Sequence, residues 1–363
     1  MKVAIVFGTR PEIIRLSRVI AALDRFCELS LIHTGQNYDE RLSDVFFREL
    51  GVRAPDAHFE IRSGGFAEQA GQILQRTGEY LSRSRPDRVL VLGDTNSGLA
   101  AIVAARMRIP VYHMEAGNRC YDDRVPEEIN RRVIDHSSDV LMPYTERSKE
   151  NLVREGIARE RIFVTGNPIH EVLTHYAGAI DGSDVLGRLK LTAGGFFLVT
   201  LHRAENVDLP QRLDRLMTGL ARVADGFELP LVVSLHPRTA DRLASFGLAP
   251  GSGRVRLLPP LGFAEFVHLE QRARCVLSDS GTVQEECAIF GVPSVTLRDV
   301  TERPETIEAG SNVLTGDDPD TILTMVRLAI DSPTAWTAPD GYLAPQVSTT
   351  VAKIVLGYDF RRS

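Results

Sequence analysis

Hydrophobic and polar positions alternate regularly along the first half of the chain. Short runs rich in Val, Ile and Leu occupy residues 3–7, 29–34, 88–93, 110–114 and 139–144. Between them, segments such as 12–26 and 96–108 repeat apolar residues every three or four positions, as on one face of an α-helix. Strands that alternate with amphipathic helices favour a parallel sheet covered by helices on both faces.

The same alternation begins again after Asn167 and Pro168. Its strand-like runs lie at 196–201, 229–236, 254–259, 275–279 and 293–297. We therefore predict two doubly wound, Rossmann-like α/β domains, over residues 1–168 and 169–345, with a ligand held in the cleft between them at the carboxyl ends of the strands. Residues 181–195, rich in Gly and small polar residues, are interpreted as a linker or variable loop.

Composition narrows the class of protein. A chain of 363 residues agrees with two domains, and a net charge of -6 argues against a nucleic-acid binder that works by bulk charge. The four cysteines lie far apart, which disfavours a zinc site and a disulfide framework. We see no secretory segment and no apolar run long enough to span a membrane, so we expect a cytoplasmic protein without a membrane partner.

A polar cluster follows the apolar run that ends at Met114. The stretch HMEAGNRCYDDRVPEEINRR places carboxylates next to arginines at a predicted strand end. This arrangement suggests an anionic ligand and a proton-transfer group. Glu115 ends this strand and Asp94 follows the preceding one, so the two carboxylates could share a site and raise one pKa. Asp94 could equally be a helix N-cap.

Two glutamates, Glu127 and Glu128, stand in the first turn of a predicted helix. Acidic residues are favourable there, but one would suffice for that role. Asn130 and Arg131, on the same helix, could equally face solvent, and both interpretations stay open at this point.

Further candidates follow other predicted strands. GTRPE places a Gly turn before a helix, where free N–H groups together with Arg10 and Arg15 suit an anion; a plain turn with solvated arginines is the alternative. His202 with Arg203, and then His236, follow two successive strands, and a His at a strand end can serve as acid, base or phosphate donor. Ser280, Gly281 and Thr282 form a turn that opens a helix and suits a diphosphate, with Glu285 or Glu286 placed for ribose hydroxyls and Arg298 and Arg303 after the next strand.

The motifs GTRPE, TGQNYD, GDTNS, HMEAGNR, PEEINR, TGNP, LHRAEN, HPR, SDSGTVQEE and RDVTERPE occur in this order over about residues 1 to 315. In order and spacing they resemble the non-hydrolysing UDP-N-acetylglucosamine 2-epimerase family. The resemblance implies the two-domain glycosyltransferase-B architecture, a helix over about 346–363 that packs back on the first domain, and a homodimer.

The resemblance also implies the reaction. Without NAD or a metal, loss of the C2 proton and of UDP gives a 2-acetamidoglycal, and UDP adds back after reprotonation, supplying precursors of bacterial surface polysaccharides. The matching acids and bases are Asp94, Glu115 and Glu127, with His202 assisting. The residues implied to bind UDP or the sugar are Arg10, Arg15, Arg131, Arg203, His236, Ser280, Gly281, Thr282, Glu286 and Arg303.

Some positions depart from the family pattern. Arg15 replaces a lysine, Thr282 replaces a glycine, and the loop after Glu115 is shorter. With these changes the motifs are most similar to the branch that makes UDP-N-acetyl-L-fucosamine, and we expect the loop 118–124 to select the sugar. Asn37 and Asp39 replace residues implied in activation by a second substrate molecule, which argues against such activation.

Two other functions are kept as alternatives. A hydrolysing epimerase would release UDP and the free 2-epimer. A glycosyltransferase would bind a UDP-sugar and pass it to an acceptor, but it would have no need of the three carboxylates.

Overall fold

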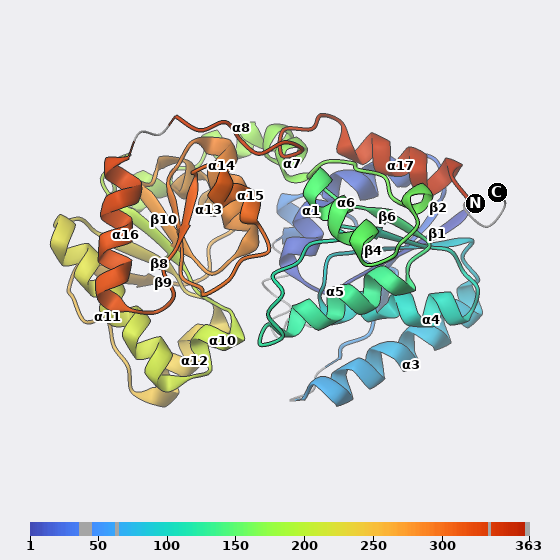
Figure 1. Ribbon diagram of the computed structural model, residues 1–363, viewed down its shortest axis with the longest axis horizontal. Helices are drawn as coiled ribbons and strands as arrows, with labels where there is room; N and C mark the ends of the chain where they lie inside the picture. The colour runs from blue at the N-terminus through green and yellow to red at the C-terminus, as the bar shows by residue number, and fades with distance from the viewer. Residues whose placement is uncertain (36–45, 62–64, 333–334, 360–363) are drawn as a thin grey trace. The chain divides into compact units, whose positions relative to one another are not determined.

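The computed structural model describes residues 1–35, 46–61, 65–332 and 335–359, which form two compact units (Figure 1). Unit 1 comprises Met1–His175 and Asp340–Ser363, and unit 2 comprises Tyr176–Pro339. Each is an α/β unit built on one six-stranded parallel sheet. The predicted doubly wound, Rossmann-like fold class is therefore confirmed. None of the described helices is long and apolar enough to cross a membrane.

The sheet of unit 1 has the strand order β3-β2-β1-β4-β5-β6. Its strands are β1 (Lys2–Phe7), β2 (Glu28–His33), β3 (Ala57–His58), β4 (Arg88–Leu92), β5 (Val111–Met114) and β6 (Val140–Met142). The side chains of residues 3–7 in β1 are fully buried. Helices cover both faces of the sheet, which explains why this strand is apolar throughout rather than alternating.

Two groups of helices cover the sheet of unit 1 (Figure 1). On one face, α1 (Arg10–Leu23) packs against α7 (Ile169–His175) and α17 (Val347–Gly357). The group on the other face comprises α3 (Phe66–Ser84), α4 (Ala100–Arg106), α5 (Pro126–Ser137) and the 3₁₀ helix η1 (Asn96–Leu99). The remaining helices in the described part of unit 1 are α6 (Glu146–Arg154) and η2 (Arg159–Arg161). Because α7 packs on α1, unit 1 extends past residue 168, where we placed the domain boundary.

Helix α17 is part of the core of unit 1. Its residues Val347, Val351 and Val355 are fully buried. Arg88 of β4 donates a hydrogen bond to the Val355 carbonyl, and Ser348 N donates to Glu171 Oε2 at 2.8 Å. The last described segment is thus held by both apolar packing and hydrogen bonds to distant parts of the sequence.

Unit 2 repeats the topology of unit 1, with the strand order β12-β11-β10-β7-β8-β9. Its strands are β7 (Phe197–Thr200), β8 (Leu231–Ser234), β9 (Val255–Leu258), β10 (Cys275–Ser278), β11 (Ser294–Thr296) and β12 (Asn312–Leu314). One group of helices comprises α10 (Ala204–Val207), α11 (Pro210–Phe227), α12 (Pro237–Phe246) and α16 (Pro319–Asp331). The other helices are α8 (Ala177–Asp181), α9 (Val185–Leu189), α13 (Phe263–Arg272), α14 (Gly281–Phe290) and α15 (Pro304–Glu308).

The interpretation of residues 181–195 as a linker or variable loop was wrong. This segment contains α9, and Val185 is fully buried in a hydrophobic cluster with Leu191, Phe196 and Leu198. The glycines that suggested a loop lie between apolar residues that face the core. The segment is therefore part of the packed structure of unit 2.

In each sheet the strand order reverses between the first and fourth strands, β1 and β4 in unit 1 and β7 and β10 in unit 2. Ligands of doubly wound sheets bind at the carboxyl ends of the strands beside such a reversal. The turns that follow these four strands carry GTRPE, GDTNS, HRAEN and DSGT. The fold thus places four of the sequence motifs where such sheets bind ligands.

Candidate active site

Glu115, directly after β5, has a strained backbone. Its φ of 64° lies in the left-handed region, which costs a non-glycine residue on the order of 1–3 kcal/mol. The carboxylate is buried and forms an ion pair with Arg15 of α1. Tyr144 Oη and Asn118 Nδ2 each donate to it at 3.3 Å. Strain that the surroundings hold in place is characteristic of functional positions.

Asp94, in the turn after β4, is bound by α5. Arg131 donates to Asp94 Oδ2 from Nη2 at 2.5 Å and from Nε at 3.2 Å, and Asn130 Nδ2 donates to the Asp94 carbonyl at 3.1 Å. The N-cap of the following 3₁₀ helix is Thr95, so the capping role considered for Asp94 is wrong. Arg131 and Asn130 are buried, which also excludes solvent-facing positions for both.

The turns that carry Asp94 and Glu115 adjoin each other. Gly93 has a φ of 70°, and a Cβ added there would lie 3.6 Å from Glu115 Oε2. Each carboxylate has its own arginine as counter-ion, Arg131 for Asp94 and Arg15 for Glu115. Two carboxylate–arginine pairs thus stand at neighbouring strand ends, whereas a shared proton between the carboxylates stays a prediction.

Glu127 and Glu128 differ in their surroundings. Glu128 is fully buried and accepts hydrogen bonds from Cys120 N at 2.9 Å and Tyr121 N at 3.2 Å. Burial raises the pKa of Glu128, but the hydrogen bond from Cys120 N and the Arg131 charge outweigh it and hold the pKa below its usual value. Glu128 therefore anchors the loop 118–124, while Glu127 is half-buried in the first turn of α5.

His113 and Asp135 connect the turns that carry these carboxylates and were not among the predicted site residues. His113 Nε2 donates to the Gly93 carbonyl at 2.8 Å, and its Nδ1 lies 2.8 Å from Asp135 Oδ1. Asp135 Oδ2 accepts from Gly117 N at 3.2 Å. One buried pair thereby fixes both turns, the one before Asp94 and the one after Glu115. The signal in the sequence was a histidine inside an otherwise apolar strand.

Glu12 connects the turns that follow β1 and β4. Its Oε2 accepts from Gly8 N at 3.1 Å and Thr9 N at 2.8 Å, and Thr95 Oγ1 donates to Oε1 at 3.2 Å. Burial raises the pKa of Glu12 to about 7, against these hydrogen bonds, which lower it. The guanidinium of Arg10, at the start of α1, lies 5.6 Å from the ring centroid of Phe46.

We expect Glu12→Gln to change how stability depends on pH. The folded state binds a proton at Glu12 more tightly than the unfolded chain, so this stabilisation is complete below about pH 4.5 and is lost as the pH rises through about 7. Between these values the free energy of unfolding of the wild type should fall by about 3 kcal/mol relative to the variant. Urea unfolding at both ends of the range measures the difference.

The control for this experiment is Glu68→Gln, an exposed glutamate in the first turn of α3. Its stability should follow that of the wild type at every pH. Parallel curves for the wild type and Glu12→Gln would contradict the prediction.

In unit 2, Asp279 organises the turn that carries His202 and Arg203. It accepts from His202 N at 3.1 Å, from Arg203 N at 2.9 Å and from Asn206 Nδ2 at 3.1 Å. Burial raises the pKa of Asp279, but the adjacent His202 ring and the hydrogen bonds from the His202 and Arg203 N–H groups outweigh it and hold the pKa far below its usual range. The ring of His236 lies 5.6 Å from that of His202, so the structure brings the two predicted histidines together.

The start of α14 lies beside an arginine. Ser280 is the N-cap and the helix begins at Gly281, where an added Cβ would lie 3.7 Å from Arg303 Cζ. Thr282 is in the first turn. A helix N-terminus and a guanidinium together suit an anion such as a diphosphate.

The two glutamates of α14 also separate into different environments. Glu285 forms an ion pair with Arg303, and Glu286 is buried beside Glu270 of α13. Arg298 instead pairs with Glu302, at 2.7 Å between Nη1 and Oε2. Of the two glutamates considered for ribose, Glu285 is thus committed to Arg303.

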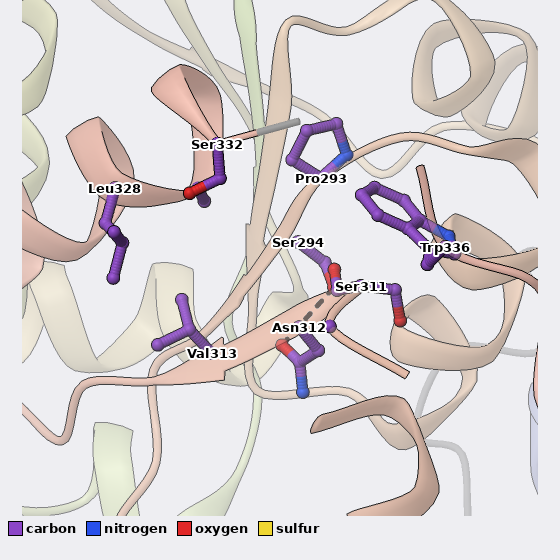
Figure 2. Close-up of a pocket in the computed structure, with 10 residues that line it drawn as sticks. Pro293, Ser294, Ser311, Asn312, Val313, Leu328, Ser332 and Trp336 are labelled. Atoms are coloured by element: carbon purple, nitrogen blue, oxygen red, sulfur yellow. Dashed lines mark hydrogen bonds between the residues drawn. The ribbon is translucent and has the colours of Figure 1, made fainter. Parts of the chain in front are cut away.

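A pocket of unit 2 lies away from these motifs (Figure 2). It is lined by Ser294 and Asn312, the first residues of β11 and β12, and by Trp336. It therefore stands at the amino ends of the strands, opposite to the ends that carry the motifs. Asn37 and Asp39, to which we assigned the loss of activation, lie outside the described residues.

The fold and these strand-end clusters define the class of protein, a two-unit enzyme of the glycosyltransferase-B type. The glycosyltransferase WaaG, at 12% identity, shares the fold with a TM-score of 0.60 over 99% of this chain and 100% of that chain. The crystal structure of Methanocaldococcus jannaschii UDP-GlcNAc 2-epimerase in complex with UDP-GlcNAc and UDP is much more similar. It has a TM-score of 0.93 at 39% identity, over 98% of this chain and 99% of that chain.

The sequence comparisons identify the family. The family model of UDP-N-acetylglucosamine 2-epimerase matches residues 21–356. The UDP-N-acetylglucosamine 2-epimerase of M. jannaschii is 41% identical over 94% of this chain and 95% of its own length. UDP-2,3-diacetamido-2,3-dideoxy-D-glucuronate 2-epimerase of Pseudomonas aeruginosa is 37% identical over 91% and 92%. The chain therefore belongs to the UDP-N-acetylglucosamine 2-epimerase family, and it is an isomerase.

Proposed function

We propose that this protein is a non-hydrolysing 2-epimerase of UDP-2-acetamido sugars. The observation that carries the proposal is the pair of carboxylates, Asp94 and Glu115, held by their arginines at adjoining strand ends. Removing the weakly acidic C2 proton needs a positioned base, and returning a proton needs a positioned acid. Glu127 is the third proton-transfer group of the proposal.

The roles divide between the two units. In unit 2, the α14 N-terminus with Ser280, Gly281 and Thr282, together with Arg303, binds the diphosphate and stabilises its departure. His202, Arg203 and His236 assist at the same diphosphate, and Glu286 accepts hydrogen bonds from the ribose. In unit 1, Arg10, Arg15 and Arg131 supply positive charge around the reacting sugar, and Arg15 and Arg131 also orient Glu115 and Asp94.

The substrate we propose is UDP-N-acetylglucosamine, interconverted with UDP-N-acetylmannosamine. A relative of known structure holds UDP-GlcNAc and UDP, and another is named for a UDP-diacetamido glucuronate. Relatives of similar identity thus differ in their sugar, and few contacts suffice for such a switch. A UDP-2-acetamido-2,6-dideoxy-L-hexose that gives UDP-N-acetyl-L-fucosamine is the second substrate to test, because the loop 118–124 around Cys120 departs from the family pattern.

The test is an incubation with UDP-N-acetylglucosamine in deuterated water, followed by NMR. We expect UDP-N-acetylmannosamine to form with deuterium at C2. Free sugar accumulating in step with UDP would show a hydrolysing enzyme instead, and turnover of the 6-deoxy-L sugar alone would assign the fucosamine branch. Absence of exchange with every UDP-sugar would overturn the proposal.

We also propose that the enzyme is a homodimer, as the family resemblance implies. Light scattering coupled to size exclusion should give twice the mass of one chain. A mass equal to one chain across a range of protein concentrations would contradict this.

A further inference from the structure

Two acidic side chains of unit 2 are buried next to each other. Glu270 of α13 is 0% exposed and Glu286 of α14 is 4% exposed, and the two side chains lie within hydrogen-bonding reach. Glu270 Oε1 accepts a bond from the Cys287 thiol at 3.5 Å. Its second oxygen, Oε2, is buried and receives no hydrogen bond from any described residue.

This geometry requires a proton between the two carboxyl groups. Two ionised carboxylates would offer each other only acceptors and would repel, whereas one protonated group can donate to the other. Burial, and then the charge of Glu286, raise the pKa of Glu270 well above its usual value. The free Oε2 of Glu270 is therefore the atom suited to carry the proton.

Two thiols lie near Glu270. Cys287 of α14 and Cys275 of β10 are fully buried thiols, and burial raises the pKa of each. Both therefore stay neutral, and neither supplies a positive charge that would let the two carboxyl groups ionise together.

We propose that Glu270 is a positioning residue, which donates a hydrogen bond from its protonated Oε2 to Glu286 and fixes that carboxylate for the ribose hydroxyls of UDP. The inference rests on the proposed function, which places Glu286 at the ribose. The donated bond fixes the rotation of the Glu286 carboxylate and so its direction toward the ribose. It also keeps a net negative charge on Glu286, which strengthens the hydrogen bonds from ribose hydroxyls.

The test compares UDP with 2′-deoxy-UDP and 3′-deoxy-UDP by calorimetry. The wild type should prefer UDP to at least one deoxy analogue. Glu270→Met removes the donor, so its affinity for UDP should fall about tenfold, while its affinity for that analogue stays within about twofold of the wild type.

Glu270→Gln retains an N–H donor at the same position, and it should keep both the affinity for UDP and the preference over the deoxy analogue. Glu265→Gln, on the same helix but paired at the surface with Arg188, is the matched control and should match the wild type.

Glu270→Asp keeps a carboxyl group on a side chain that is one methylene shorter. It replaces Glu270→Met in the experiment if that variant does not fold. It too should lose preference for the ribose hydroxyl. A merely structural role would weaken UDP and the deoxy analogue equally, and that result, or an unchanged preference in the folded variants, would overturn the inference. The proposed function fails separately, if the wild type does not bind UDP or if Glu286→Gln leaves the preference intact.

Discussion

Replacing Glu115 with glutamine is expected to lower kcat by about 10² to 10⁴-fold, the range that one general acid or base contributes. The amide has nearly the shape of the carboxyl group but cannot exchange a proton with C2. The proposed UDP-binding residues of unit 2 are unchanged, so the affinity for UDP should stay within about twofold. Steady-state kinetics, deuterium incorporation at C2 and calorimetry with UDP measure the three quantities.

The substitution also leaves Arg15 without its buried counter-ion, which costs on the order of 3–5 kcal/mol of stability. Rates must therefore be expressed per folded enzyme, with the folded fraction taken from thermal unfolding. The matched control is Glu60→Gln, an exposed glutamate whose φ of 52° lies in the same left-handed region. We expect wild-type kcat for this control. Deuterium exchange at the wild-type rate in folded Glu115→Gln would rule out the proton-transfer role.

Replacing Asp279 with asparagine is expected to lower the free energy of unfolding by about 3 kcal/mol at neutral pH. The new amide points a donor at backbone N–H groups that now bind a carboxylate, those of His202 and Arg203. The turn after β7 should shift, and the affinity for UDP should fall with it. Urea unfolding and calorimetry with UDP measure the two effects.

The pH dependence gives this second prediction its own check. Because the folded pKa of Asp279 is lowered, its stabilisation is present above about pH 4 and is lost as the pH falls through the folded value. The difference between the wild type and Asp279→Asn should therefore shrink in acid. Asp320→Asn, which removes a surface partner of Arg222, should cost less than about 1 kcal/mol. An equal loss in both variants would contradict the prediction.

Most of the fold could be predicted because strands buried on both faces leave continuous apolar runs. Two of the four edge strands were missed for the converse reason: β3 has only Ala57 and His58, and β12 begins with Asn312. Residues 181–195 were misread because small residues separate the apolar side chains that reach the core, such as Val185 and Leu191. Pattern alone does not reveal which side chains a neighbouring layer will cover.

Only part of the candidate site could be predicted, namely the residues that directly follow predicted strands. Asp94, Glu115, His202 and Ser280 follow predicted strands, so their position on the sheet edge could be derived from the order of motifs. Of the groups that hold them, Arg15 and Arg131 were among the predicted residues, whereas Asp135 and Asp279 were not, because they act through contacts between elements distant in sequence. Asp279 had a usable signal, since it also follows a strand directly, but its neighbours Ser280 and Gly281 drew the functional interpretation.

The way in which unit 1 is assembled from two segments has a consequence for biosynthesis. A ribosome completes unit 2, which is one continuous stretch of chain, before it makes α17. Until then the surface of α1 that packs on α17, together with the hydrogen-bonding partners of Val355 and Ser348, stays uncovered. A nascent or prematurely terminated chain would thus expose apolar surface of its first-made half, the kind of surface that chaperones and proteases recognise. Translation to the last helix is what makes the earliest part of the polypeptide a finished structure.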